Sequence, residues 1–221
     1  MEIKPVFVGI KYQINLGYVA RVLSNFGYSS MHLVKPRAKV GKTAIKYSKH
    51  GVHIFKNMVE YNSLDEAVED CDIVVGTTGI WEKAKSAPIR LELHRLREFL
   101  KKRKVKRVAL VIGRDDTGLS AEEVRMCDIA AFIDSSESYP VLNISHALAI
   151  FLYCLSDLKG KEESEEMPNR EELKLLLEIF EEKIKRRKVR NKESIIRSFR
   201  KIIISSSANK KDVHALITAL K

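Results

Sequence analysis

The sequence predicts an α/β protein whose parallel sheet is covered by helices on both faces. Five short β-branched runs are apolar on both faces, as strands buried in a parallel sheet covered by helices are. Helical patterns alternate with these runs over positions 1–160, which is typical of an open α/β sheet. A chain of 221 residues is long enough for one such domain and a small appendage.

Each element is predicted from its local pattern. The expected strands are 6–10, 31–34, 73–75, 108–112 and 129–133. Helical spacing of apolar residues predicts helices at 16–26, 91–100 and 144–158. Two further helix starts carry the capping-box spacing, Ser63 with Glu66 and Ser120 with Glu123.

Domain boundaries follow from a change in composition. Residues 1–160 form the α/β domain, and the polar, acidic stretch 161–169 with Pro168 is predicted to be a linker. Residues 170–221 contain three short apolar stripes at helical spacing, which predict a small helical extension. Because so few residues make a marginal core alone, we expect this extension to pack on the first domain or on a partner subunit.

The formal net charge of +11 favours a polyanionic partner, either nucleic acid or an anionic membrane surface. Residues 171–221 hold 14 basic and 7 acidic side chains, which leaves +4 for positions 1–170. A solvated helix face, with acid early and base late along the helix dipole, explains such a run equally simply. The functional interpretation is that a cluster of six cations grips RNA phosphates: Lys183, Lys185, Arg186, Arg187, Lys188 and Arg190.

Several classes of protein are disfavoured. No apolar run reaches the roughly 18 residues of a membrane span, and the N-terminal segment 1–10 lacks the layout of a secretory signal. The three cysteines are far apart, show no metal-ligand spacing and suit reduced thiols, so we expect a cytoplasmic protein without a metal. Dinucleotide, phosphate-loop, serine-hydrolase and zinc-protease motifs do not occur.

Polar and glycine residues follow the predicted strands in four places, where ligands of α/β sheets bind. These segments are N-L-G-Y-V-A-R at 15–21, V-G-T-T-G at 75–79, G-R-D-D-T-G-L at 113–119 and the stretch 133–147. Each also has a plain structural interpretation: Asn15 and Asn143 suit helix N-caps, and the glycines suit turns. His146 is better explained as a packed or surface histidine than as a catalytic base.

Taken together and in this order, the segments resemble the SPOUT superfamily of RNA methyltransferases, in the branch that methylates the ribose 2′-hydroxyl. Asn15, Gly17 and Arg21 are similar to the first motif of that branch, residues 113–119 to the second, and L-N-I-S-x-A at 142–147 to the third. The resemblance covers about residues 4–158. The helical tail resembles that of the subgroup that modifies the anticodon loop of tRNA.

The resemblance implies a deep trefoil knot formed around residues 138–158, a homodimer, and S-adenosylmethionine as cofactor. It implies that the cofactor is held by Thr77, Thr78, Gly79, Gly113, Ile133, Val141, Leu142 and Asn143. It assigns catalytic roles to Arg21, Asn15, Asn143, Ser145 and Asp115, with Arg21 holding the phosphate or activating the hydroxyl. The expected reaction is 2′-O-methylation of tRNA, at cytidine or uridine 32 of the anticodon loop.

Two positions depart from the family pattern. Asp115 stands where the family usually has Glu, which keeps the charge and shortens the reach. Val141 stands where the family usually has Ser, so Ser138, Tyr139, Ser145 or a water molecule would have to replace that hydroxyl. The alternatives left open are an rRNA ribose methyltransferase, a non-catalytic RNA-binding protein of the same fold and a membrane-surface binder.

Overall fold

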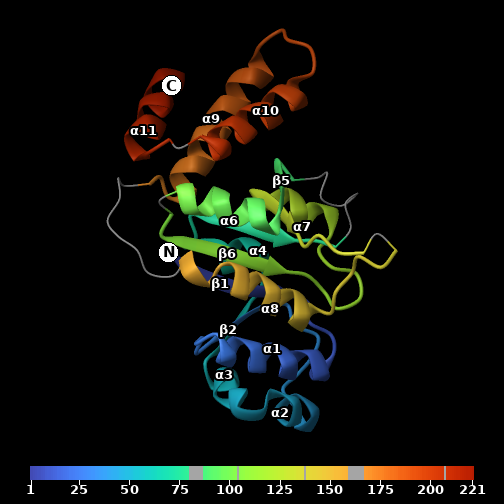
Figure 1. Ribbon diagram of the computed structural model, residues 1–221. Coiled ribbons are helices and arrows are strands. Elements are labelled where there is room, and N and C mark those ends of the chain that lie inside the picture. The colour runs from blue at the N-terminus through green and yellow to red at the C-terminus, as the bar shows by residue number, and fades with distance from the viewer. Residues whose placement is uncertain (80–86, 104, 137, 159–166, 207) are drawn as a thin grey trace.

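The structure is a computed structural model that describes residues 1–79, 87–103, 105–136, 138–158, 167–206 and 208–221 (Figure 1). Its centre is a parallel seven-stranded sheet with the order β3-β2-β1-β6-β4-β7-β5. The strands are β1 (Glu2–Val8), β2 (Met31–Val34), β3 (Met58–Tyr61), β4 (Ile73–Thr77), β5 (Ile89–Glu92), β6 (Arg107–Ile112) and β7 (Ile129–Phe132).

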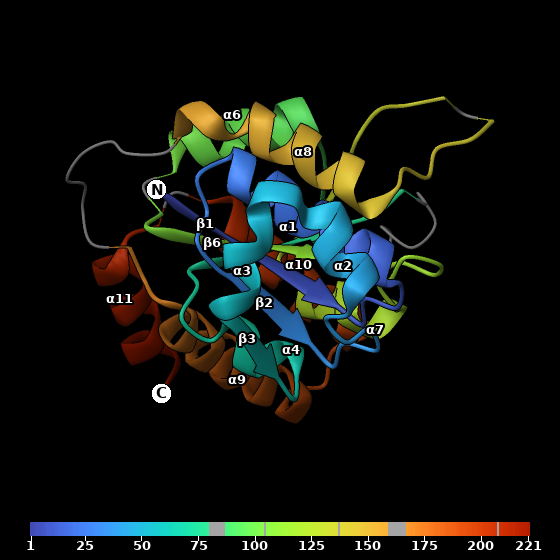
Figure 2. The same ribbon diagram turned by 90° about the horizontal axis from the view of Figure 1, so that it is seen from below.

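Helices connect the strands and form the C-terminal part of the chain (Figure 2). Those of the α/β domain are α1 (Gln13–Asn25), α2 (Lys42–Ser48), η1 (Lys49–Val52), α3 (His53–Lys56), α4 (Leu64–Val68), α6 (Leu93–Lys102), α7 (Ala121–Met126), α8 (Ile144–Cys154) and η2 (Ser156–Leu158). Those of the extension are α9 (Arg170–Arg186), α10 (Lys192–Ser205) and α11 (Lys210–Leu220).

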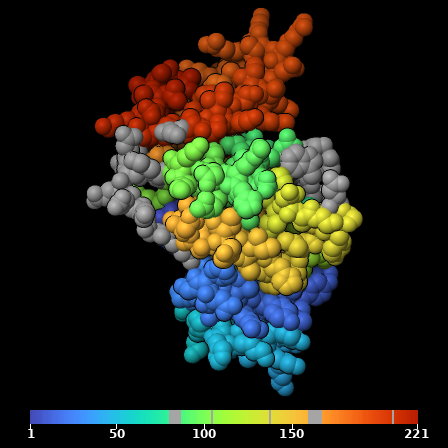
Figure 3. Space-filling model, in the orientation of Figure 1, coloured from blue at the N-terminus to red at the C-terminus, as the bar shows by residue number. Residues whose placement is uncertain are grey.

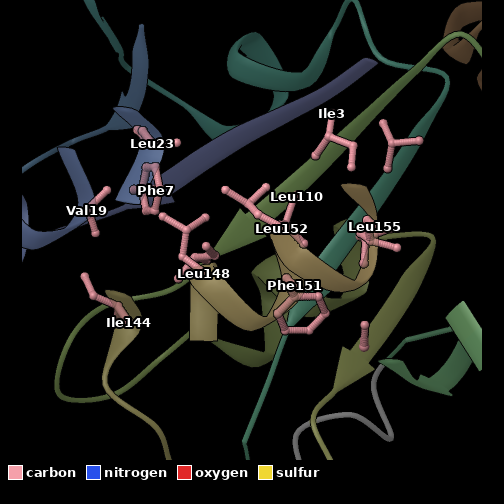
Figure 4. Packing of buried hydrophobic residues seen from close by; sticks show 14 of the residues in the cluster. Ile3, Phe7, Val19, Leu23, Leu110, Ile144, Leu148, Phe151, Leu152 and Leu155 are labelled. Carbon is pink, nitrogen blue, oxygen red and sulfur yellow. The ribbon is translucent and has the colours of Figure 1, made fainter. Parts of the chain in front are cut away.

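The sheet is covered on both faces, as predicted. Ile3 and Phe7 of β1 belong to the larger core cluster, which contains the apolar faces of α1, α6 and α8. Val6 and Val8 point the other way and belong to a second cluster under α4 and α7. Figure 4 shows Leu148, Phe151 and other α8 side chains against the first face. Side chains alternate along a strand, so both faces of β1 must be apolar.

The five predicted strands are all present, but two edge strands were missed. β3 and β5 lie at the outer positions of the sheet, where most of their side chains are only partly buried or exposed and the apolar signal fades. β1 also begins earlier than predicted, at Glu2. Its buried Lys4 is paired with Asp70, with Nζ 2.8 Å from Oδ1, and this pair allows a lysine to lie buried within the strand.

Helix starts follow the predicted caps in part. Ser120 and Glu123 form a complete capping box at α7. Ser63 accepts a hydrogen bond from the Glu66 backbone N, but the Glu66 carboxylate accepts from the backbone N of Asn62 instead of Ser63. The second half of the predicted box is therefore displaced by one position.

The extension packs on the α/β domain, as expected. Leu176, Ile203, Val213 and Ile217 form its own small core, and Ile204 enters the core of the domain. Arg200 of α10 donates to the Asp128 carboxylate and to a backbone oxygen of α7. Residues 161–166 of the predicted linker lie outside the described residues, and the predicted domain boundaries stay a prediction.

Candidate active site

A cleft lies at the carboxyl ends of the neighbouring strands β6, β4 and β7. Its lining is mostly apolar with a few polar and backbone groups, which is typical of a site for a small-molecule ligand. Seven of the eight predicted cofactor residues line it: Thr77, Thr78, Gly79, Gly113, Ile133, Val141 and Leu142. The eighth, Asn143, lies between two residues of the lining but does not itself line the cleft.

Two glycines let the backbone segments around the cleft approach one another. A Cβ on Gly113 would lie 2.2 Å from the backbone of Gly118 and Leu119, so any side chain there would force the loop after β6 open. A Cβ on Gly79 would lie 3.2 Å from the Pro140 carbonyl oxygen. The cleft is thus a cradle of backbone groups with an apolar lining that includes Ile112, Leu119, Ile133 and Phe151.

A hydrogen-bonded network joins the three motifs at one edge of this cleft. The Asp115 carboxylate accepts from Asn15 Nδ2 and, at 2.7 Å, from the backbone N of Lys11. Asn143 Nδ2 donates to Asn15 Oδ1 at 2.9 Å. Asn143 Oδ1 in turn accepts from Ser145 N and Oγ at 2.9 and 2.8 Å. Residues far apart in the chain therefore hold one another in a fixed arrangement.

Asn15 is not a helix cap, and that interpretation was wrong. α1 begins at Gln13 after the N-cap residue Tyr12, which makes no side-chain cap. Asn15 lies inside the first turn, is buried and uses both its amide groups in the network. A buried amide in a helix needs such partners, because leaving it unpaired costs about 1–3 kcal/mol. The shorter acid at position 115 still reaches it.

Asn143 is the N-cap of α8, as its spacing indicated, and its side chain accepts from Ser145 N. Ser145 is buried and committed to Asn143, so its hydroxyl is not directed into the cleft in place of the family serine. The Ser138 hydroxyl lies 2.8 Å from that of Ser136, and Tyr139 is exposed. Val141 is half-exposed and lines the cleft with an apolar side chain.

Arg114 and Glu123 brace the loop that forms one wall of the cleft. Both terminal guanidinium nitrogens of Arg114 donate to the Glu123 carboxylate at 2.8 Å, and one also contacts the Gly118 carbonyl oxygen at 3.3 Å. Burial alone would raise the pKa of Glu123, but hydrogen bonds from Arg114 and Ser120 lower it below its usual value. The same carboxylate therefore caps α7 and fixes the loop.

A second, exposed ion pair joins the loop after β6 to the connection between β1 and α1. Lys11 Nζ lies 3.0 Å from Asp116 Oδ2. The hydrogen bond from Lys11 lowers the pKa of the Asp116 carboxyl. As an exposed pair it contributes little to stability, but it joins the β1–α1 connection to a residue of the cleft.

Arg21 does not line the cleft of its own chain. It is exposed on α1, just beyond the buried Val19 and Ala20. Arg21 follows Asn15 by six positions in the helix, which places the two side chains about 120° apart around the axis. Only Asn15 therefore faces the network.

The predicted RNA-binding cluster lies apart from the cleft, at the end of α9 and in its connection to α10 (Figure 1). All six cations are exposed. Lys185 and Arg186 are paired with Glu181 and Glu182 one turn earlier, at 2.7 and 3.7 Å. Those pairs partly offset the charge that the sequence displays.

Sequence reasoning missed several residues of the site. Lys11 contributes a backbone donor, and Glu123 braces Arg114, although Glu123 was predicted only as a capping residue. The position of Lys11 in the same connection as the first motif was an available signal. The pairing of Glu123 with Arg114 could not be predicted from spacing, because nine positions, including the loop after β6, separate the two residues.

Three further features of the described residues concern metal-ligating clusters, thiol groups and membrane-spanning helices. Across these residues there is no group of three His, Cys, Asp or Glu side chains placed to hold a metal ion. Cys71, Cys127 and Cys154 carry free thiols, and burial raises the pKa of Cys71 to about 12. Within the same ranges no helix is both long enough and apolar enough to cross a membrane.

Comparison with known proteins identifies the family. Residues 3–153 match the SpoU rRNA Methylase family. The chain belongs to this family, whose members use S-adenosylmethionine as methyl donor. The match spans the sheet, the cleft and all three motifs of the network.

Individual relatives extend the likeness over the whole chain. The tRNA (cytidine-2'-O-)-methyltransferase TrmJ of Methanocaldococcus jannaschii is 31% identical, with 99% of this chain and 98% of that protein aligned. The crystal structure of TrmJ from Z. mobilis covers 100% of this chain and 98% of its own, with a TM-score of 0.74 and 20% identity. An AdoMet-bound rRNA methyltransferase from Sinorhizobium meliloti covers 72% of this chain and 57% of its own, with a TM-score of 0.58 and 19% identity.

Proposed function

We propose that the protein transfers a methyl group from S-adenosylmethionine to the ribose 2′-hydroxyl of tRNA, at cytidine or uridine 32 of the anticodon loop. The observation that carries this proposal is the network of Asn15, Asp115 and Asn143, which joins the three motifs beside a cleft lined by seven of the eight residues predicted to hold the cofactor. The end-to-end likeness to a tRNA (cytidine-2'-O-)-methyltransferase supports tRNA over rRNA as substrate.

The cleft residues fit the cofactor. Backbone groups around Gly79 and Gly113 and the hydroxyls of Thr77 and Thr78 would hold its polar parts, and Ile133 and Leu142 its apolar surfaces. Bound there, S-adenosylmethionine supplies an electrophilic methyl group on a positively charged sulfur. Val141 does not impair such binding, because the neighbouring backbone remains available.

The protein's own contribution is to position the hydroxyl and to lower the cost of releasing its proton to solvent water. The oxygen must lie in line with the bond that breaks, and fixed geometry supplies much of such a rate enhancement. Arg21 would hold the substrate phosphate and stabilise negative charge on the hydroxyl oxygen, because a guanidinium remains protonated and is a poor base. Asn15, Asp115, Asn143 and Ser145 would keep this edge of the site rigid.

We further propose a homodimer in which Arg21 of one protomer completes the cleft of its partner. The support is the exposed position of Arg21 on α1, outside the cleft of its own chain. Mixing Arg21→Ala subunits with cofactor-defective Gly79→Val subunits would then restore activity that neither variant has alone. A particle with the mass of a single chain by light scattering, or no restoration, would contradict this arrangement.

Two finer features belong to the same proposal. Residues 138–158 would form the family's trefoil knot, supported by the close approach of Gly79 to the backbone before α8. An experimental density map that traces this segment would test the knot. We also propose that the protein works in the cytoplasm, where its free thiols would stay reduced.

The decisive experiment is incubation of the purified protein with labelled S-adenosylmethionine and total tRNA, followed by nucleoside analysis. We expect label in 2′-O-methylcytidine or 2′-O-methyluridine and its loss from a tRNA that lacks the hydroxyl at position 32. Label only in rRNA would favour the rRNA alternative. Binding of RNA without transfer would favour a non-catalytic RNA-binding protein.

A further inference from the structure

The N-terminal quarter of the chain has an extreme charge distribution. Residues 3–59 contain ten lysines and arginines and no aspartate or glutamate. Seven of these cations fall within residues 35–56, which form α2, η1, α3 and the connection that leads to them. We name residues 35–56 the basic lobe; its cations are Lys35, Arg37, Lys39, Lys42, Lys46, Lys49 and Lys56.

All seven cations are exposed, and none forms an ion pair with a residue that the structure describes. Lys42 and Lys46 share one side of α2, and Lys49 follows at its end, while Ala44 and Ser48 are buried. Ordinary solvated helices mix both signs of charge. A surface that carries only positive charges is instead typical of a region that binds a polyanion such as nucleic acid.

The basic lobe is packed along α1 and reaches the candidate catalytic arginine. A Cβ on Gly41 would lie 2.5 Å from the Gln13 side chain, and one on Gly51 would lie 3.1 Å from Cα of Arg21. α2 and η1 therefore run beside α1 from its first residue to Arg21. Figure 3 shows this lobe, in light blue to cyan, at the opposite end of the molecule from the extension.

Two of the lysines occupy backbone conformations that lysine rarely adopts. Lys35 has φ 45°, and Lys49 has φ 51° with ψ −119°, at the turn between α2 and η1. Glycine or asparagine is the usual residue in such places, because a side chain strains the backbone there. Because lysine is kept at these two positions despite the strained backbone, we expect the two side chains to serve binding and not folding. Cationic side chains of this kind bind phosphates.

We infer that the basic lobe binds the phosphate backbone of the tRNA substrate outside the target loop and guides the RNA toward Arg21. This inference rests on the proposed function for the identity of the RNA. The chemistry itself requires only a polyanion whose phosphates follow the exposed side of α2. No base-specific group is needed, so the contact adds affinity and register without sequence preference.

The test compares two triple variants of the full-length protein with equal loss of charge. Lys42→Gln/Lys46→Gln/Lys49→Gln removes the cations on and directly after α2. Lys101→Gln/Lys102→Gln/Lys106→Gln is the matched control, at exposed positions near the opposite end of the sheet. Kd for tRNA is measured for both over a series of salt concentrations, together with the melting temperature and Kd for S-adenosylmethionine.

We expect Lys42→Gln/Lys46→Gln/Lys49→Gln, the lobe triple, to raise Kd for tRNA at least about 10-fold at low salt. The salt slope, by which we mean the slope of log Kd against log salt concentration, should fall by about 2–3. The control triple should change the slope by less than about 1, and both should bind the cofactor like the wild type. Equal slopes for the two triples, or an unchanged Kd in the lobe triple, would overturn the inference. If the triple unfolds, the single variants Lys42→Gln and Lys46→Gln carry the same comparison.

Methylation assays separate this inference from the proposed function. If the wild type methylates tRNA, the lobe triple should raise KM for tRNA and leave kcat near the wild-type value. If the wild type does not methylate tRNA, the proposed function fails, while the salt slopes of binding still decide whether the lobe is an RNA surface.

Discussion

The basic lobe and positions 171–221 of the helical extension carry the same net charge of +7 and differ in how that charge is arranged. The lobe has seven cations and no acid, whereas the extension balances 14 cations against 7 acids over positions 171–221. In the extension, Lys185 and Arg186 are paired along α9, and Lys210 and His214 share Glu172. The number of cations therefore overstates the extension as an RNA surface, whereas the net charge of positions 1–170 as a whole hides the lobe.

The largest effect is expected at Arg21, which borders the basic lobe. Arg21→Ala should lower methyl transfer about 10³-fold, because it removes the group proposed to stabilise charge on the attacking oxygen. Arg21→Lys should fail as well, since an ammonium lacks the planar two-pronged contact with phosphate. Single-turnover rates measure the effect, and circular dichroism checks the fold. A folded Arg21→Ala protein with wild-type kcat would remove Arg21 from the chemistry.

The network should give the next largest effect, and unlike the lobe it should act on the rate of methyl transfer and not on the affinity for RNA. Asp115→Asn keeps the shape but replaces an acceptor oxygen with a donor, so either Asn15 Nδ2 or the backbone N of Lys11 loses its partner. We expect kcat to fall about 100-fold with little change in Kd for tRNA. A variant that weakens tRNA binding as strongly as it slows transfer would place Asp115 on the RNA surface instead.

The brace between Arg114 and Glu123 should appear as pH-dependent stability. Because the folded-state pKa of Glu123 is lowered, its stabilising contribution is present above the unfolded-state pKa of about 4.5 and is lost as the pH falls through the folded-state pKa. Glu123→Gln should reduce the free energy of unfolding by about 2 kcal/mol at neutral pH and remove this part of the acid sensitivity. Urea unfolding from neutral to acidic pH measures it; parallel pH profiles for variant and wild type would show that the pair contributes nothing.

A smaller effect is expected from the extension than from the lobe. Arg186→Gln/Arg187→Gln/Lys188→Gln should lower the dependence of log Kd for tRNA on log salt concentration by about 2, less than the lobe triple, because Arg186 already shares its charge with Glu182. Salt titrations beside those of the lobe triple make the comparison direct. If the extension triple loses more affinity than the lobe triple, the ranking of the two regions is reversed.

Lys49→Gly should give the smallest change. We expect it to raise stability and to weaken tRNA binding. Relief of the strain at φ 51° should raise the free energy of unfolding by about 1 kcal/mol. The same variant should weaken tRNA binding slightly, since one phosphate contact is lost. Thermal unfolding and filter binding measure the two effects. A destabilised Lys49→Gly protein would show that the lysine side chain serves the fold, against the role in the lobe.

Much of the architecture was predictable because buried segments have a clear local signature. The five central strands are apolar on both faces, and the helices between them show regular spacing, so local pattern was sufficient. β3 and β5 escaped because edge strands bury only part of their surface. β1 was placed too late because burial of Lys4 depends on Asp70, which lies far away in the chain.

The candidate site was predicted as a set of residues but not as an arrangement. Motif order identified Asn15, Asp115 and Asn143, yet the sequence offered a helix cap as the plain explanation of Asn15. Only the folded chain shows that Asn15 bridges the other two. The pairing of Arg114 with Glu123 and the separation of Arg21 from its own cleft were equally invisible.

The sequence by itself determined the α/β class, the central strands and the helical extension. Those features depend on burial patterns whose meaning is local. The residues predicted to hold the cofactor came from the resemblance of the motifs to a family. Tertiary structure alone decided which polar groups meet and which cations stay unpaired. Hydrogen bonds and ion pairs act over about 3 Å, whereas the partners here, such as Asn15 and Asn143, lie far apart in the chain. For the same reason the basic lobe became visible only when each cation could be checked for a nearby acid.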